Sequence, residues 1–161
     1  MTSFSDIRST YTKYRTAQQA YWADLQKRAF NLGRGFEHYL GLSGEVYSAA
    51  DGTNERYVQV GVVEGGQFRR SLGADFNADG LKVDFCVSLV VDESPDELPK
   101  RRFLINLKLG KVQDGYVVEL LTSTGSVSFS LAKETMANDA IALYDAIAFE
   151  ITAKLDPRVF D

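Results

Sequence analysis

The feature that constrains this chain most is a long apolar stripe at its start. Over residues 4–40, apolar side chains recur every three or four positions, which is typical of one face of a helix. Ser3 or Ser5 can cap its first turn, and Asp6 suits the positive end of the helix dipole. The stripe consists of Phe4, Ile7, Tyr11, Tyr14, Tyr21, Trp22, Leu25, Ala29, Leu32, Phe36 and Tyr39.

The length of this helix is out of scale with the chain. Gly33 and Gly35 each cost about 1 kcal/mol in a helix interior, so we expect a break there and then a short helix through Leu40. Even if it stops at Leu32, the first helix has about 28 residues and is about 42 Å long. A domain of 161 residues has a radius of gyration of about 15 Å. We therefore expect this helix either to overhang the domain or to be covered by a second copy.

The middle of the chain, residues 44–131, alternates between apolar and polar positions as a sheet does. Turn residues separate the runs, and none of the connections leaves room for a helix. The longest loop, 92–100, contains two prolines. The pattern predicts an antiparallel meander of about five strands, at 56–63, 81–91, 102–109, 116–122 and 126–131, with weaker strands at 45–48 and 67–72.

A second helix is expected over about 134–155, ended by Pro157. Its stripe consists of Met136, Ala140, Leu143, Ile147, Ile151 and Leu155. Within 140–151 only Asp145 and Glu150 are charged, so we expect the helix to be covered over most of its girth.

These elements predict a single α+β domain spanning residues 1–161. A helical segment over 1–42 precedes the sheet over 44–131, and the C-terminal helical segment covers 133–157. Both helices are expected on one face of the sheet, because each has one apolar side to bury.

Composition narrows the function. Eighteen Lys and Arg against 22 Asp and Glu give a net charge of −4, the wrong sign for a protein that binds nucleic acid by neutralising phosphates. The longest uncharged stretch, 120–132, is shorter than the roughly 20 apolar residues of a membrane span. The start of the chain lacks the apolar run of a secretory signal. We expect a cytoplasmic protein that binds neither nucleic acid nor a membrane and needs no cofactor.

One segment resembles a metal site in its residue types. Residues 75–80, Asp-Phe-Asn-Ala-Asp-Gly, match the first six positions of an EF-hand calcium loop. The twelfth position, however, is Cys86 rather than the bidentate Glu. Asn, Asp and Gly are equally what a tight hairpin needs, so we interpret 75–80 as a turn, with a weak calcium site as the alternative. For zinc, His38 and Cys86 stand alone on different elements.

Catalytic motifs are incomplete. A Ser–His or Cys–His arrangement would have to use His38, the one histidine, and residues 41–45 miss the G-x-S-x-G elbow because Glu45 replaces a glycine. Asp84 and Glu119 are expected on the outward face of the sheet, near each other or near lysines. We interpret them as solvated cross-strand pairs rather than as acid–base catalysts.

Two features favour a binding role. The first helical segment holds eight of the 19 aromatic residues, and Tyr and Trp suit interfaces as well as cores. The outward sheet face is expected to expose Val90, Leu104, Val117 and Leu121, and a contiguous patch of that kind marks an interaction site. The candidate partner-binding residues are Tyr11, Tyr14, Tyr21, Trp22, Leu104 and Val117.

The sequence thus favours a non-enzymatic protein-binding module that associates with another protein and forms a homo-oligomer, as a dimer. An adaptor, a chaperone-like binder, and an inhibitor or immunity protein all fit a small acidic chain without catalytic motifs. The alternative is a small-molecule binder or enzyme with its pocket between the sheet and the C-terminal helix. The lining expected for that pocket is Phe85, Tyr116, Phe129, Tyr144 and His38.

Overall fold

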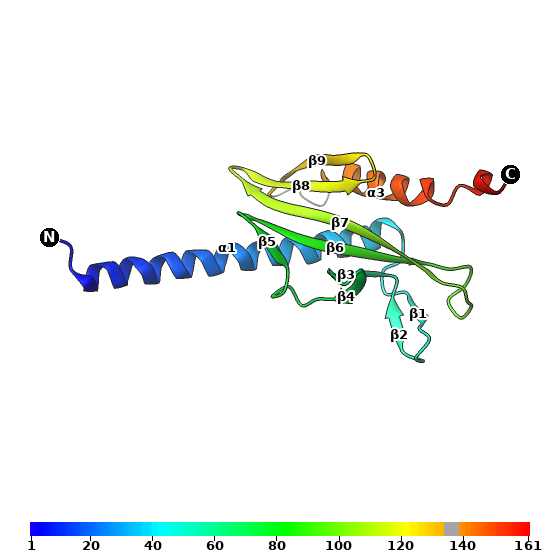
Figure 1. Cartoon of the computed structure of the whole chain (residues 1–161), viewed down its shortest axis with the longest axis horizontal. Helices are drawn as coiled ribbons and strands as arrows, with labels where there is room; N and C mark the ends of the chain where they lie inside the picture. Colours follow the sequence, from blue (N-terminus) through cyan, green and yellow to red (C-terminus); the bar gives the residue numbers. More distant parts are fainter. Residues whose placement is uncertain (134–138) are drawn as a thin grey trace.

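A computed structural model describes residues 1–133 and 139–161 (Figure 1). In it, a long N-terminal helix runs beneath an antiparallel sheet, and a shorter C-terminal helix lies beside the far strands. The elements are α1 (Phe4–Tyr39), β1 (Val46–Ser48), β2 (Asn54–Arg56), β3 (Val58–Glu64), β4 (Gln67–Arg70), β5 (Asn77–Asp79), β6 (Lys82–Val91), β7 (Arg101–Val112), β8 (Gly115–Thr122), β9 (Gly125–Ala132), α3 (Ile141–Ala153) and the 3₁₀ turn η1 (Pro157–Phe160).

The described part of the sheet has seven strands in the order β4-β3-β6-β7-β8-β9, with β5 paired to β6 beside β3. Every pairing is antiparallel, which confirms the predicted α+β class. Only β6 to β9 form a simple meander, because the β3–β4 hairpin joins β6 with β4 outermost. Beyond the five strands predicted, the sheet contains β4, which the sequence predicted as a weaker strand at 67–72, and β5, a three-residue strand in the segment interpreted as a turn. β1 and β2 form a separate hairpin.

Both helices bury their apolar sides against one face of the sheet, as predicted. α1 packs on β3, β6 and β7, and α3 packs on β8 and on α1. The most deeply buried core side chains, none more than 3% exposed, come from α1, the sheet and α3: Leu25, Phe36, Phe85, Val87, Leu109, Tyr116, Leu120, Leu143 and Ile147.

The expected break at Gly33 and Gly35 is wrong, because α1 runs without interruption from Phe4 to Tyr39. The two glycines serve close packing instead. A Cβ on Gly33 would overlap Cγ2 of Val60 on β3, and a Cβ on Gly35 would overlap the phenol oxygen of Tyr144 on α3. The cost in helix propensity is therefore offset by letting α1 approach both the sheet and the second helix.

The C-terminal helix is less covered than predicted. The first residues of the predicted helix, 134–138, lie outside the described part of the chain, and α3 begins at Ile141. Its inner side is buried, but Ile141 is 49% exposed and Phe149 is 72% exposed. The prediction that this helix is buried around most of its circumference is thus wrong. Its packing partners, β8 and α1, leave the outer side of α3 open.

Tyr144 couples this packing to pH. Its phenol donates a hydrogen bond to the carbonyl oxygen of Leu32, 3.0 Å away, and burial raises its pKa from 10.0 to about 12. Because the folded state holds this proton more tightly than the unfolded state, its contribution to stability is complete below pH 10 and is lost as the pH rises through about 12. The difference in pKa corresponds to about 3 kcal/mol.

Tyr144→Phe is therefore expected to cost about 1 kcal/mol at neutral pH through the lost hydrogen bond, yet to flatten the alkaline loss of stability. Urea unfolding at neutral pH and in the window between pH 10 and about 12 measures both effects. Burial and the hydrogen bond to Asp92 also raise the pKa of Tyr57 to about 12. The variant should therefore still lose some stability at alkaline pH, because Tyr57 is unchanged in it. Identical pH profiles for the two proteins would contradict the role assigned to Tyr144.

Candidate functional site

The first half of α1 extends beyond the rest of the molecule. We call residues 4–20 the projecting segment; it reaches about 25 Å past the sheet, on the left in Figure 1. All of its side chains are exposed except that of Gln18, which is half-buried. A capping box closes its first turn, since the amide of Asp6 donates to the Ser3 hydroxyl at 3.2 Å and the amide of Ser3 donates to the Asp6 carboxylate at 2.9 Å.

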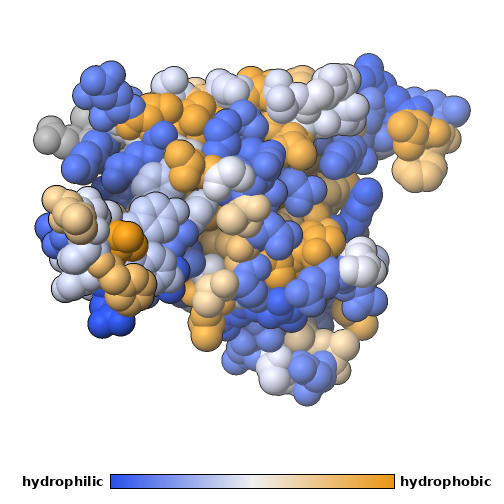
Figure 2. Space-filling view, turned by 60° about the vertical axis from the view of Figure 1, so that its left-hand side comes forward, coloured by the Kyte–Doolittle hydropathy of each residue, from blue (hydrophilic) through white to orange (hydrophobic). Residues whose placement is uncertain are grey.

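One side of this segment is apolar. Phe4, Ile7, Tyr11 and Tyr14 are between 56% and 68% exposed, and we call them the projecting stripe. At 100° per residue they lie on the same side of α1 as the buried Leu25. Figure 2 shows this end of the helix coming forward on the left, with apolar and polar side chains gathered on it. The stripe is thus the side that meets the sheet further along, continued past the point where the sheet ends.

Tyr21 and Trp22 lie at the base of the projecting segment and pack against the core. Their rings meet edge to face with centroids 5.2 Å apart, and the Tyr21 hydroxyl donates to the carbonyl oxygen of Leu81 at 2.5 Å. Beside them, at the rim of the sheet, Leu81 is 69% exposed and Val112 is 48% exposed. Of the aromatic candidates, Tyr11 and Tyr14 are therefore free to meet a partner, whereas Tyr21 and Trp22 fix the direction in which the helix leaves the body.

A polar cluster beneath this base anchors α1 to β7 and β8. Asp24 accepts a hydrogen bond from the Tyr116 hydroxyl at 2.6 Å and lies 3.6 Å from Lys111 and 3.5 Å from Arg28. Burial alone would raise the pKa of Asp24, but the Tyr116 hydrogen bond and the charges of Lys111 and Arg28 together lower it. The same burial and the bond to Asp24 raise the pKa of Tyr116.

The outer face of the sheet does not bring its two candidates together. Leu104 and Val117 are both half-buried, but Val117 pairs with Gly110, six residues along β7 from Leu104, or about 20 Å. On the same face, an ion pair of 2.9 Å joins Lys82 to Glu119.

Two further expectations concern this outer face. Val90 was expected to be exposed there, and this is wrong: it is 4% exposed and belongs to the core cluster that includes Tyr47 and Tyr57. The carboxylates behave as predicted. Glu119 pairs with Lys82, and Asp84 lies 3.8 Å from Lys108, so these residues form solvated cross-strand pairs.

The segment that resembles a calcium loop forms a hairpin. Gly80, at φ +64°, turns the chain from β5 into β6. Asp75 binds Ser71 and Arg69, whereas Asp79 pairs with Lys108 at 2.6 Å, so different cations hold the two carboxylates. Within residues 1–133 and 139–161, no three His, Cys, Asp or Glu side chains are grouped to hold a metal ion.

The residues proposed for catalysis or for a pocket under α3 do not line the hollow found there. His38 is exposed, with Nδ1 3.4 Å from the Ser43 hydroxyl, which is not the buried and oriented pair that nucleophilic catalysis needs. Phe85, Tyr116 and Tyr144 are core residues. The hollow between the sheet and α3 measures about 40 Å³, against the 300–1,000 Å³ or so of ordinary ligand sites.

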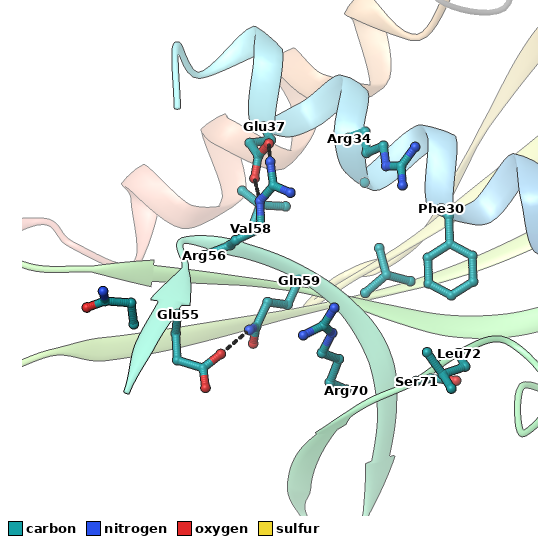
Figure 3. Close-up of a pocket in the computed structure, with 13 residues that line it drawn as sticks. Phe30, Arg34, Glu37, Glu55, Arg56, Val58, Gln59, Arg70, Ser71 and Leu72 are labelled. Atoms are coloured by element: carbon teal, nitrogen blue, oxygen red, sulfur yellow. Dashed lines mark hydrogen bonds and ion pairs between the residues drawn. The ribbon is translucent and has the colours of Figure 1, made fainter. Parts of the chain in front are cut away.

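A larger hollow, of about 380 Å³, lies between α1 and the β2–β3–β4 region (Figure 3). Arg34 of α1, Arg56 of β2 and Arg70 of β4 lie around it, and we call it the arginine hollow. The sequence alone does not reveal it, because these residues are far apart along the chain.

Comparison with protein families, curated proteins and solved structures finds no match to this chain. Among the described residues, no helix combines the length and the apolar character needed to cross a bilayer. The candidate sites are therefore the projecting stripe and the arginine hollow, judged by their own geometry.

Proposed function

We propose that this protein is a non-enzymatic protein-binding module that dimerises through the projecting stripe. The observation that carries the proposal is the exposure of Phe4, Ile7, Tyr11 and Tyr14 on a part of α1 that no other described element covers. A segment of this length is marginal as an isolated helix in water, and large apolar side chains on one side of it favour a covering partner.

The spacing of the stripe favours another helix as that partner. Positions 4, 7, 11, 14, 18, 21 and 25 alternate steps of three and four, the spacing of the seam between two coiled helices. A second copy supplies such a helix with the same spacing. Paired antiparallel, Phe4 faces Tyr21 of the second copy, Ile7 faces Gln18, and Tyr11 faces Tyr14.

The body of the molecule favours the antiparallel direction. From Leu25 onward the seam side of α1 is covered by its own sheet, so a parallel partner helix would run into that sheet. An antiparallel partner ends at its own Phe4, beside Tyr21 and the exposed Leu81, before it reaches the covered part. The projecting segment thus has the length needed to pair with the projecting segment of a second copy.

The distribution of charge along the chain also favours the antiparallel dimer. Residues 1–20 hold one acidic residue, Asp6, and three basic ones, Arg8, Lys13 and Arg15, for a net charge of +2. The whole chain carries −4, so residues 21–161 carry −6. The antiparallel pair brings each basic tip beside the acidic body of the other copy, whereas a parallel pair aligns tip with tip.

Such a dimer is bivalent. The two Leu25 positions, where the bodies begin, are about 38 Å apart at opposite ends of the helix pair. Two identical bodies at a fixed spacing bind a partner that has two sites more tightly than one body does, through effective concentration. This arrangement is consistent with an adaptor.

Disulfide formation between introduced cysteines tests both the dimer and its direction. When Ile7→Cys and Gln18→Cys proteins are mixed and oxidised, we expect a covalent heterodimer. Ile7→Cys alone should not form one, since its two copies lie about 16 Å apart along the axis and a disulfide needs Cα atoms within about 7 Å. Cys86 does not interfere, because it is 1% exposed and burial raises its pKa to about 11.

Light scattering of the unmodified protein at micromolar concentration gives the independent readout, with a mass twice that of the chain expected. Efficient oxidation of Ile7→Cys with itself would indicate a parallel pair. A monomer that shows no cross-link in any mixture would remove the proposal.

A further inference from the structure

We propose that the arginine hollow is a binding site for a small organic anion, one that carries a phosphate or carboxylate group on an apolar portion. The proposal is independent of the dimer, because the hollow lies along the covered half of α1, between Phe30 and Glu37. Its volume of about 380 Å³ falls within the ordinary range for ligand sites, about 300–1,000 Å³.

One of the three arginines is held in place by a buried acid. Arg56 donates from Nε to Glu37 at 3.0 Å and from Nη2 at 2.8 Å, and Glu37 is only 5% exposed. Both bonds use the same edge of the guanidinium group, so its Nη1 side is directed away from Glu37. Figure 3 shows this pair on the α1 wall of the hollow.

The other two arginines reach into the hollow from opposite walls. In Figure 3 Arg34 descends from α1 and Arg70 rises from the end of β4. Neither has an ion-pair partner among the described residues. The one further acid of the lining, Glu55, accepts a hydrogen bond from Gln59 at 2.7 Å.

The charge and the floor of the hollow define the chemistry of its ligand. Three arginines against Glu37 and Glu55 give the lining a net charge of +1 in a chain that carries −4. Planar guanidinium groups bind phosphate and carboxylate oxygens through two parallel hydrogen bonds. The apolar part of the lining consists of Phe30, Val58, Val60 and Leu72, which suits a small apolar or ring portion beside the anionic group.

Calorimetric titration with inorganic phosphate, phenyl phosphate and benzoate, each at constant ionic strength in chloride, tests the site. We expect saturable binding of phenyl phosphate or benzoate, tighter than that of inorganic phosphate because only the organic anions fill the apolar part. Comparing the two organic probes shows whether a phosphate or a carboxylate is preferred.

The variant Arg34→Gln/Arg70→Gln should weaken that binding by about tenfold or more, since charge-assisted hydrogen bonds are lost. Both side chains are exposed, so the fold should persist, and thermal unfolding checks this. The matched control Lys133→Gln/Lys154→Gln removes two positive charges at exposed positions outside α1 and β4, and it should bind as the unmodified protein does. The proposal is overturned if none of the three probes binds saturably, or if binding survives in Arg34→Gln/Arg70→Gln.

Discussion

Replacing Tyr11 and Tyr14 with glutamate is expected to convert the proposed dimer into a monomer, with the mass of one chain, without unfolding it. These side chains are 61% and 60% exposed in the single chain, so the body does not depend on them. In the antiparallel pair they face each other at the centre of the seam, where four carboxylates would lose water without gaining partners. We expect the dissociation constant to rise by about 100-fold or more, as measured by analytical ultracentrifugation.

The matched control is Ser9→Glu/Thr16→Glu, which adds the same number of carboxylates on the opposite side of the same helix. It should remain a dimer. In both variants, the body of the molecule should keep its cooperative thermal unfolding transition. If both pairs of substitutions dissociate the dimer equally, general charge repulsion explains the effect. If neither does, the copies associate through another surface. Either result contradicts a dimer held together by the stripe.

The sequence predicted those parts of the fold that depend on local pattern. Alternation over 81–91 and 102–109 located β6 and β7 to within a few residues, and the three-and-four spacing from Phe4 located α1. The overhang also followed from local information, because a helix has a fixed rise per residue whatever it packs against.

What the sequence could not provide depends on contacts between distant residues. The propensity of Gly33 and Gly35 argued for a break, and only the positions of Val60 and Tyr144 show why the helix continues through them. In the same way, Arg34 and Arg70 become neighbours of one hollow only once the β3–β4 hairpin lies beside α1. Alternation correctly predicted which side chains point to the outer face of the sheet, but it could not predict that Val90 is buried there.

Gly33→Ala is expected to destabilise the protein by about 3 kcal/mol, although alanine is the better helix former by about 1 kcal/mol. The new methyl group would overlap Cγ2 of Val60, which is 8% exposed on β3 between β4 and β6 and has little room to move. Urea unfolding measures the loss. Asn31→Ala, at an exposed position of the same helix, is the control and should change stability by no more than about 0.5 kcal/mol.

The double variant Gly33→Ala/Val60→Ala separates a steric cause from a general weakness of α1. Val60→Ala alone should cost stability by leaving a cavity. Combined with Gly33→Ala, it also removes the methyl group that the new alanine would overlap. The loss of stability in the double variant should therefore be clearly smaller than the sum of the two single losses. Simple additivity would mean that the clash is not with Val60. A Gly33→Ala protein as stable as the original would mean that α1 can move away from β3, and the close approach would then not be what requires glycine at this position.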